Sequence, residues 1–336
     1  MRALVTGATG FIGSHVARAL LEAGWEVRGL RRSSAPPWQL TGPEPEWFTG
    51  DLGDLDSLRR AVAGCDAVFH VAGHYALWAP DEEVFEAVNV QGTRNVLLVA
   101  REAEVQRVVY TSSVACVGAA PPGGLADEDT PVAESELRGG YERSKLAAER
   151  LALAAAAEGQ DVVVVNPAST IGPGDIKPTP TGKIVLDFIE GRIPFYLDTG
   201  LNFVDVRDVA AGHLLAWERG VSGRRYILGH PAGNLSLRDF LGVVGRAAGR
   251  RPPRLRIPYS LAWVAGLSST FLADRVTGRP PAVPLVGVQL SRRRMAFDPT
   301  RAITELGLQH RPLEQTVADA VAWFRQTGRR VAASPS

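Results

Sequence analysis

Short apolar, β-branched runs alternate with helix-length segments through the first half of the chain. Continuous apolar strands between helices are typical of a parallel sheet that is covered on both faces. The expected strands are Ala3–Val5, Glu26–Leu30, Glu46–Thr49, Ala67–His70, Arg107–Ser112 and Asp161–Asn166. The expected helices are Phe11–Ala23, Leu55–Ala63, Asp81–Ala103 and Tyr141–Glu158. The pattern predicts an α/β fold with a doubly wound parallel sheet, which binds ligands at the carboxyl ends of its strands.

The alternation is lost after Pro167, where proline and glycine become frequent. The elements still predicted there are a strand near 202–204, a helix over 206–219 and a strand at 225–228. We therefore expect three regions: a main domain (1–166), a mixed region that completes the sheet and adds a smaller C-terminal substrate-binding lobe (167–330), and a frayed tail (331–336).

Composition argues against several classes of function. The formal net charge of +1 lacks the basic excess that nucleic-acid binding requires. Cys65 and Cys116 match no metal-ligand spacing, so we expect no metal site. No apolar run reaches about 20 residues, so stable membrane insertion is not expected. The first residues predict a strand and a turn instead of a signal peptide, which indicates a cytoplasmic protein.

A glycine-rich turn, Thr6-Gly7-Ala8-Thr9-Gly10-Phe11-Ile12-Gly13, follows the first strand and opens the first helix. Its glycines permit a tight turn, a close approach of the backbone to a pyrophosphate, and close helix–strand packing, and the helix N-terminus offers free N–H groups to the phosphates. This order predicts a Rossmann-type NAD(P)-binding domain over 1–166. The expected cofactor contacts in the turn are Gly7, Thr9, Gly10, Phe11 and Ile12.

The segment after the second strand indicates which cofactor is bound. An acid there would bind the ribose of NAD, whereas an arginine suits the 2′-phosphate of NADP. Residues 27–34 contain no acid, and Arg32, with help from Arg31 and Ser33, is the candidate phosphate contact. The alternative is that these arginines are solvated surface groups. We expect NADPH, with NAD(H) left open.

Two further strand ends are placed to meet the cofactor. Asp51 and Leu52, after the third strand, would meet the adenine ring. Val71, Ala72 and Gly73, after the fourth strand, would pass beneath the middle of the cofactor. Either segment could instead be an ordinary loop.

Tyr141 and Lys145 begin a predicted helix, and their spacing of four places them on one face. A phenol has a pKa near 10, and a neighbouring ammonium favours its ionised form. Tyr141 could then exchange a proton with a carbonyl or alcohol oxygen as hydride is transferred, and Lys145 could reach the nicotinamide ribose. The strand that ends in Thr111-Ser112-Ser113 would supply a hydroxyl to hold the reacting oxygen.

These features together resemble the extended short-chain dehydrogenase/reductases of the NAD-dependent epimerase/dehydratase superfamily. The matching segments are residues 6–13, 51–52, 89–93, 111–113, 141–145, 166–167 and 203–210. The resemblance implies that Ser113 is the catalytic hydroxyl, that Asn89 lies near the active site, and that Pro167 contacts the cofactor. It also implies a homodimer formed through the helices at 81–103 and 141–158.

Within that family the chain resembles the dihydroflavonol reductase-like branch through Arg32 and Tyr110-Thr111-Ser112-Ser113. It is more closely similar to proteins called hopanoid-associated sugar epimerases, through residues 75–80, 171–183 and 198–202. The expected substrate is a small molecule. Its candidate contacts are His74, Tyr75 and Trp78 after the fourth strand, together with Ser113 and Thr170. A loop packed on its own aromatic side chains is an equal alternative for 74–78.

The combined prediction is an NAD(P)H-dependent oxidoreductase that transfers hydride between nicotinamide and a ketone, aldehyde or secondary alcohol. One alternative is a nucleotide-sugar 4-epimerase that uses the same three residues with tightly bound NAD. The missing acid after the second strand counts against it. A more remote alternative is a protein that senses dinucleotide without chemistry, although such proteins usually lack the Tyr/Lys pair.

Overall fold

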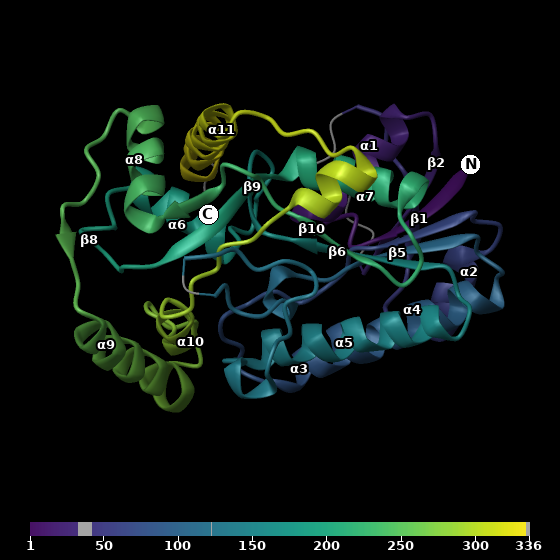
Figure 1. Cartoon of the computed structure of the whole chain (residues 1–336), viewed down its shortest axis with the longest axis horizontal. Helices are drawn as coiled ribbons and strands as arrows, with labels where there is room; N and C mark the ends of the chain where they lie inside the picture. Colours follow the sequence, from purple (N-terminus) through teal and green to yellow (C-terminus); the bar gives the residue numbers. More distant parts are fainter. Residues whose placement is uncertain (33–41, 122, 334–336) are drawn as a thin grey trace.

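The structure, a computed structural model, describes residues 1–32, 42–121 and 123–333 (Figure 1). Within these residues, seven strands form the central sheet: β1 (Arg2–Thr6), β2 (Glu26–Arg31), β3 (Glu46–Thr49), β4 (Ala67–His70), β5 (Arg107–Thr111), β6 (Val162–Pro167) and β10 (Arg225–Leu228). Every neighbouring pair is parallel, in the order β10-β6-β5-β4-β1-β2-β3. The order reverses between β1 and β4, where such sheets bind ligands.

Helices cover both faces of this sheet, as the apolar strands predict (Figure 1). One face carries α1 (Phe11–Glu22) and α7 (Val206–Arg219), and the other carries α2 (Leu55–Val62), α4 (Gly92–Glu102) and α5 (Gly140–Ala157). All six residues of β6 are buried. The predicted doubly wound parallel sheet is confirmed.

The continuous α-helix predicted over Asp81–Ala103 is wrong in its middle. The segment consists of α3 (Glu83–Phe85), a π-helical turn η1 (Glu86–Gln91), and α4. The wider turn contains Asn89, whose carbonyl accepts a hydrogen bond from Thr93 Oγ1 at 2.6 Å. Such π-helical turns occur often at functional sites.

The second half of the chain completes the sheet with β10 and α7 and builds further layers (Figure 1). Its small sheets contain β7 (Ser169–Ile171), β9 (Gly200–Asp205) and β11 (Asn234–Ser236), and β8 (Phe195–Tyr196) with β12 (Leu255–Arg256). Its helices are α6 (Pro180–Ile189), α8 (Leu237–Ala248), α9 (Tyr259–Leu272), α10 (Leu285–Leu290) and α11 (Leu313–Ala333). Short turns are η2 (Val114–Cys116), η3 (Glu134–Glu136), η4 (Ala273–Thr277) and η5 (Ala302–Leu306).

A separate apolar core holds these layers together. The rings of Phe203 and Phe240 stack with centroids 3.7 Å apart, between β9 and α8. Helix α11 extends into the segment expected to be a frayed tail, and residues 334–336 lie outside the described residues. None of the helices in the described ranges is long and apolar enough to cross a membrane.

Candidate active site

The glycine turn after β1 has the geometry that a bound pyrophosphate requires. Gly7 has a φ of +70°, and a Cβ there would lie 2.7 Å from Ala72 Cα, in the loop after β4. A Cβ on Gly13 would lie 2.1 Å from the Gly7 carbonyl oxygen. Gly10 precedes α1 without a side-chain cap, so the first N–H groups of the helix are free of side-chain acceptors. These features fit the phosphates of a dinucleotide.

The other predicted cofactor residues border the same edge of the sheet. Thr9 is exposed, Phe11 and Ile12 are half-buried at the start of α1, and Val71 and Gly73 follow β4. The Asp51 carboxylate accepts the Gly53 N–H at 2.8 Å, and the Leu52 carbonyl accepts Asn95 Nδ2 at 2.7 Å. Pro167 is buried at the end of β6.

Arg32 lies exposed directly after β2. Burial, and then the Arg32 charge, lowers the pKa of His74 after β4. The guanidinium is therefore close enough to the nucleotide-binding edge to act on groups there. Arg31 lies over the Trp47 ring, with its Cζ 4.9 Å from the ring centroid. Ser33 lies outside the described residues.

A chain of buried hydrogen bonds joins Thr6, at the start of the glycine turn, to the π-helical turn η1. His70 Nε2 lies 3.0 Å from Thr93 Oγ1, which donates to the Asn89 carbonyl. His70 Nε2 must therefore carry the proton, and Nδ1 accepts from Thr6 Oγ1 at 2.7 Å. Thr6 Oγ1 accepts the Ala72 N–H at 3.2 Å. Burial lowers the pKa of His70 to about 3, so the imidazole stays in the neutral form that these hydrogen bonds require.

The structure brings Tyr141, Ser113 and Lys145 together at the carboxyl end of β5. Tyr141 and Lys145 lie in the first turns of α5, and the Ser113 hydroxyl is close enough to the Tyr141 phenol to influence its pKa. Lys145 Nζ donates to the Thr111 carbonyl at 2.6 Å, and burial lowers its pKa to about 8. Ser112, the alternative hydroxyl, donates to Cys116 Sγ at 3.4 Å.

The pKa of Tyr141 shifts in the direction opposite to our expectation. We expected the Lys145 ammonium to lower it. Burial instead raises the pKa of Tyr141, and the neighbouring Tyr75 adds to the rise, while the Ser113 hydroxyl opposes it only in part. The Lys145 ammonium lies over the Tyr110 ring, 4.7 Å from its centroid, and donates its hydrogen bond to the Thr111 carbonyl. Tyr141 is therefore a protonated phenol near neutral pH.

Asn89 anchors the segment after β4 to the catalytic helix. Its Oδ1 accepts the His74 N–H at 2.7 Å, and its Nδ2 donates to the His74 carbonyl at 3.1 Å and to Ser144 Oγ at 2.9 Å. Both backbone groups of His74 are therefore held, and with them the backbone that leads into Tyr75. The Tyr75 ring accordingly lies over Tyr141, with centroids 4.6 Å apart.

The other expected substrate contacts have different neighbours. The His74 ring meets Phe85 edge-on at 5.1 Å. Trp78 Nε1 donates to Asp274 Oδ1 in η4 at 2.7 Å, so it links the segment after β4 to the smaller lobe. Thr170 is buried, and its hydroxyl donates to the Ala168 carbonyl at 3.0 Å. Of these residues, Tyr75 is the one in ring contact with Tyr141.

A buried ion pair behind Ser113 was missed in the sequence. Glu149 accepts Arg225 Nη1 at 3.0 Å and Asn166 Nδ2 at 2.7 Å, and Asn166 Nδ2 also donates to the Ser113 carbonyl at 3.0 Å. The available signal was spacing, since Glu149 lies four residues after Lys145 on the same face of α5. The network fixes the backbone that carries the Ser113 hydroxyl.

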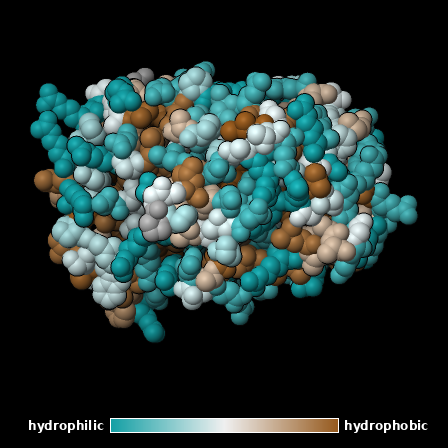
Figure 2. Space-filling view, in the orientation of Figure 1, coloured by the Kyte–Doolittle hydropathy of each residue, from teal (hydrophilic) through white to brown (hydrophobic). Residues whose placement is uncertain are grey.

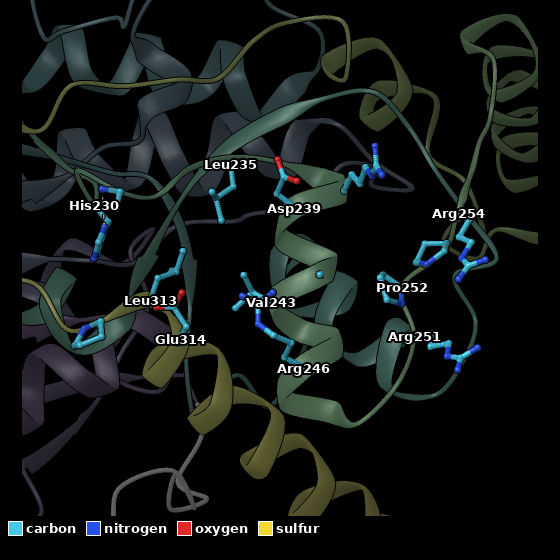
Figure 3. A pocket seen from close by; sticks show the side chains of 15 residues that line it. His230, Leu235, Asp239, Val243, Arg246, Arg251, Pro252, Arg254, Leu313 and Glu314 are labelled. Carbon is cyan, nitrogen blue, oxygen red and sulfur yellow. Dashed lines mark hydrogen bonds between the residues drawn. The ribbon is translucent and has the colours of Figure 1, made fainter.

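A broad groove lies elsewhere, over α8 (Figure 3). It has a volume of about 990 Å³, and Figure 3 shows Arg246 and Asp239 of α8 between Leu313 on one side and Arg254 on the other. Among the described residues, none of the predicted catalytic side chains lines it. The groove is therefore separate from the candidate active site.

Known proteins resemble this chain over nearly its whole length. It is 47% identical over 332 residues to a protein of Synechocystis sp. named "Putative dihydroflavonol 4-reductase", with 96% of this chain and 94% of that protein covered. It is 34% identical over 335 residues to a 4-hydroxy-2-methyl-3-oxo-4-farnesyl-3,4-dihydroquinoline-1-oxide ketoreductase of Stigmatella aurantiaca, with 98% and 97% covered. The crystal structure of gox2253 superposes with a TM-score of 0.85 at 44% identity, covering 97% of this chain and 98% of the other.

The match to a family model agrees with these relatives. Residues 3–229 match the NAD dependent epimerase/dehydratase family, a range that contains the glycine turn, Ser113, Tyr141 and Lys145. The resemblance inferred from the motifs is thus confirmed, including its reductase-like branch. The chain belongs to the NAD dependent epimerase/dehydratase family.

Proposed function

We propose that this protein is an NADPH-dependent carbonyl reductase that acts on a ketone or aldehyde, with Tyr141 as the general acid. The observation that carries the proposal is the state of Tyr141. Burial raises its pKa, so the phenol keeps a proton to give, and the Ser113 hydroxyl lies beside it. Reduction of a carbonyl needs such a donor at the oxygen, whereas alcohol oxidation needs a base.

Each residue has a distinct task in this reaction. Bound NADPH would supply the hydride to the carbonyl carbon. The Ser113 hydroxyl holds the carbonyl oxygen beside Tyr141, which transfers its phenolic proton to that oxygen to give the alcohol. Lys145 would hold the nicotinamide ribose, and the buried Glu149 network keeps the Ser113 backbone in place. Tyr75 lies on Tyr141 and must move aside for a carbonyl to reach it.

Arg32 supports NADPH over NADH in this proposal. It is exposed at the end of β2, and its positive charge acts on His74 across the nucleotide-binding edge. A charged hydrogen bond to the 2′-phosphate contributes about 1.5–3 kcal/mol. Arg32→Ser should therefore lower kcat/KM with NADPH by about tenfold or more and leave kcat/KM with NADH nearly unchanged. Arg60→Ser, a change at another exposed arginine, is the control.

The relatives support the reaction class. The Stigmatella aurantiaca relative is named a ketoreductase and the Synechocystis relative a dihydroflavonol 4-reductase, and both names denote reduction of a carbonyl group. The first test is NADPH oxidation in the presence of a panel of ketones and aldehydes. Tyr141→Phe should lower turnover by about a hundredfold or more while NADPH binding persists. Tyr196→Phe, remote on β8, should keep full activity.

Two results would contradict the proposal. Full activity of Tyr141→Phe would remove the proposed acid from the mechanism. The second result comes from denaturing the purified protein and identifying the nucleotide released. Near-stoichiometric NAD would indicate an epimerase that retains its cofactor, and would refute the role of Arg32. Little nucleotide, or NADP(H), is expected for a reductase that exchanges its cofactor at each turnover.

A further inference from the structure

Helix α9 exposes apolar side chains over half of its circumference. Ala262 and Gly266 are its buried residues. The large apolar residues exposed on α9 and on the following η4 are Leu261, Trp263, Val264, Leu267, Phe271, Leu272 and Val276. At 100° per residue, those of α9 lie opposite Ala262 and Gly266. Leu261 and Phe271 are each 60% exposed. A patch of this kind marks an interaction site.

Arginines flank this apolar face along the chain. Residues 250–294 contain nine arginines and one acid, Asp274, although the whole chain has a net charge of only +1. The exposed arginines here are Arg250, Arg251, Arg254, Arg256, Arg275, Arg279, Arg292 and Arg294. Arg251 and Arg254 line the groove over α8, and Arg256 pairs with Asp198 at 2.9 Å. Asp274 accepts the Trp78 indole N–H. In Figure 2, apolar surface appears at the lower left, where α9 lies, beside strongly hydrophilic side chains.

Aromatic rings and arginines also lie together in a hollow at the edge of α9. The hollow has a volume of about 390 Å³, and Tyr259 and Trp263 of α9 line it. Arg138, Arg292 and Arg293 line it as well, together with one acid, Glu136. Aromatic rings next to guanidinium groups suit the boundary between acyl chains and phosphate headgroups.

We propose that α9 and its flanking arginines dock on the surface of an anionic lipid bilayer, with the helix axis in the plane of the interface. In-plane binding needs an apolar face, a cationic border and a helix that need not span the membrane. All three are present, since no helix in the described ranges is long and apolar enough to cross a bilayer. The proposal does not depend on the reaction at Tyr141.

A second copy of the chain fits this face less well. A symmetric dimer places the same patch on both subunits face to face. The arginines that border α9 would then meet the arginines of the other copy, with like charges brought together in a partly dry contact. A bilayer rich in anionic headgroups offers the opposite charge and also takes up the apolar side chains.

Docking in this way would bring the candidate active site to the membrane. Trp78, three residues after Tyr75, bonds to η4 directly after α9. Helix α10 packs beside the start of α5, because a Cβ on Gly139 would lie 3.1 Å from Val286 Cγ1. Tyr141 thus lies on the side of the molecule that docks, within reach of a carbonyl compound that partitions into lipid.

Vesicle flotation of the full chain tests the proposal. Vesicles of phosphatidylglycerol with phosphatidylethanolamine are compared with vesicles of phosphatidylcholine at about 0.1 M salt. Wild type should float with the anionic vesicles, and Leu267→Ser/Phe271→Ser should lower the partition coefficient by about tenfold or more. The control is Leu125→Ser/Val221→Ser, which changes residues that are 45% and 50% exposed elsewhere on the surface.

A charge variant keeps the test valid if the apolar variant fails to fold. Arg275→Gln/Arg279→Gln changes exposed groups only and should also weaken flotation, as should about 0.5 M salt. Equal binding to both vesicle types, or no binding by folded wild type, overturns the proposal. So does an equal loss in the Leu125/Val221 control. Light scattering that shows a wild-type oligomer lost in Leu267→Ser/Phe271→Ser would assign the face to a second copy and overturn it too.

Discussion

Removing the arginine of the buried ion pair behind Ser113 should strongly destabilise the protein. Glu149 has only 2% of its side chain exposed, and Arg225 has 20%. Arg225→Met keeps the aliphatic stem of the side chain but removes the charge that compensates Glu149. The carboxylate is then left in an apolar layer between α5 and the sheet. Its other side-chain partner is the Asn166 amide, at 2.7 Å.

The expected cost follows from this burial. Breaking a buried pair by removing one partner costs about 3–5 kcal/mol, because the remaining charge is uncompensated. The whole domain is expected to have a free energy of unfolding of about 5–15 kcal/mol, so this loss is a large fraction of it. Glu149→Gln should cost less, about 1–2 kcal/mol, since its amide oxygen still accepts from Asn166 and Arg225 is nearer to water.

Arg224, next to Arg225 in the chain, supplies a matched control. Arg224 pairs with Glu305 at 2.6 Å, but its side chain is 50% exposed. Because a solvated pair contributes about 0–1 kcal/mol, Arg224→Met should change the free energy of unfolding by no more than that. Urea unfolding at pH 7, followed by far-UV circular dichroism, gives the free energy and its denaturant slope for each variant.

The double variant distinguishes an uncompensated charge from lost packing. Arg225→Met/Glu149→Gln removes the isolated carboxylate and should be more stable than Arg225→Met alone. Equal costs for Arg224→Met and Arg225→Met, or a double variant no more stable than Arg225→Met, would refute the reasoning.

Four further predictions follow from the structure. Gly13→Ala should destabilise the fold and abolish cofactor binding, measured by NADPH titration, because its Cβ would meet the Gly7 carbonyl at 2.1 Å. Burial lowers the pKa values of His15, His70 and His213 to about 4, 3 and 4, so protonation of the unfolded chain should reduce stability as the pH falls from about 6.5 toward 4. Urea unfolding should show a loss of up to about 1.4 kcal/mol per pH unit for each histidine, and a constant midpoint would contradict it. Carbonyl reduction should slow as the pH rises through about 8, where Lys145 loses its charge, and a pH–rate profile that stays flat above that value would exclude this role. Light scattering at micromolar concentration should give the mass of a homodimer formed through 81–103 and 141–158, and a monomeric mass would contradict it.

The sheet and the nucleotide turn could be predicted because local chemistry determines them. Strands such as Val162–Pro167 are buried on both faces, so they carry a continuous apolar run that is visible in one dimension. Gly7 is required by its positive φ in the tight turn, and Gly13 by its contact with the Gly7 carbonyl, within the βαβ unit itself. The predicted helix at 206–219 and strand at 225–228 agree with α7 and β10, because their buried apolar positions are also visible in the sequence.

What the sequence did not reveal depends on contacts between distant segments. The π-helical turn at Glu86–Gln91 arises where Asn89 must meet both His74 and Ser144, 15 and 55 residues away in the chain. The pairing of Glu149 with Arg225 spans 76 residues. Helix α9 of the smaller lobe was missed because it is apolar on its exposed side, so the usual polar face is absent.

A single property of the site, the burial of its ionisable groups, moves two pKa values in opposite directions. Burial disfavours the charged form of any group, so it raises the pKa of the Tyr141 phenol and lowers that of the Lys145 ammonium. At neutral pH the phenol remains protonated while the ammonium, with its pKa of about 8, still carries its charge. Both are the forms that reduction of a carbonyl requires. Tyr75, whose ring lies on Tyr141, adds to the rise in the pKa of Tyr141, so the side chain that a substrate must displace also favours the protonated acid.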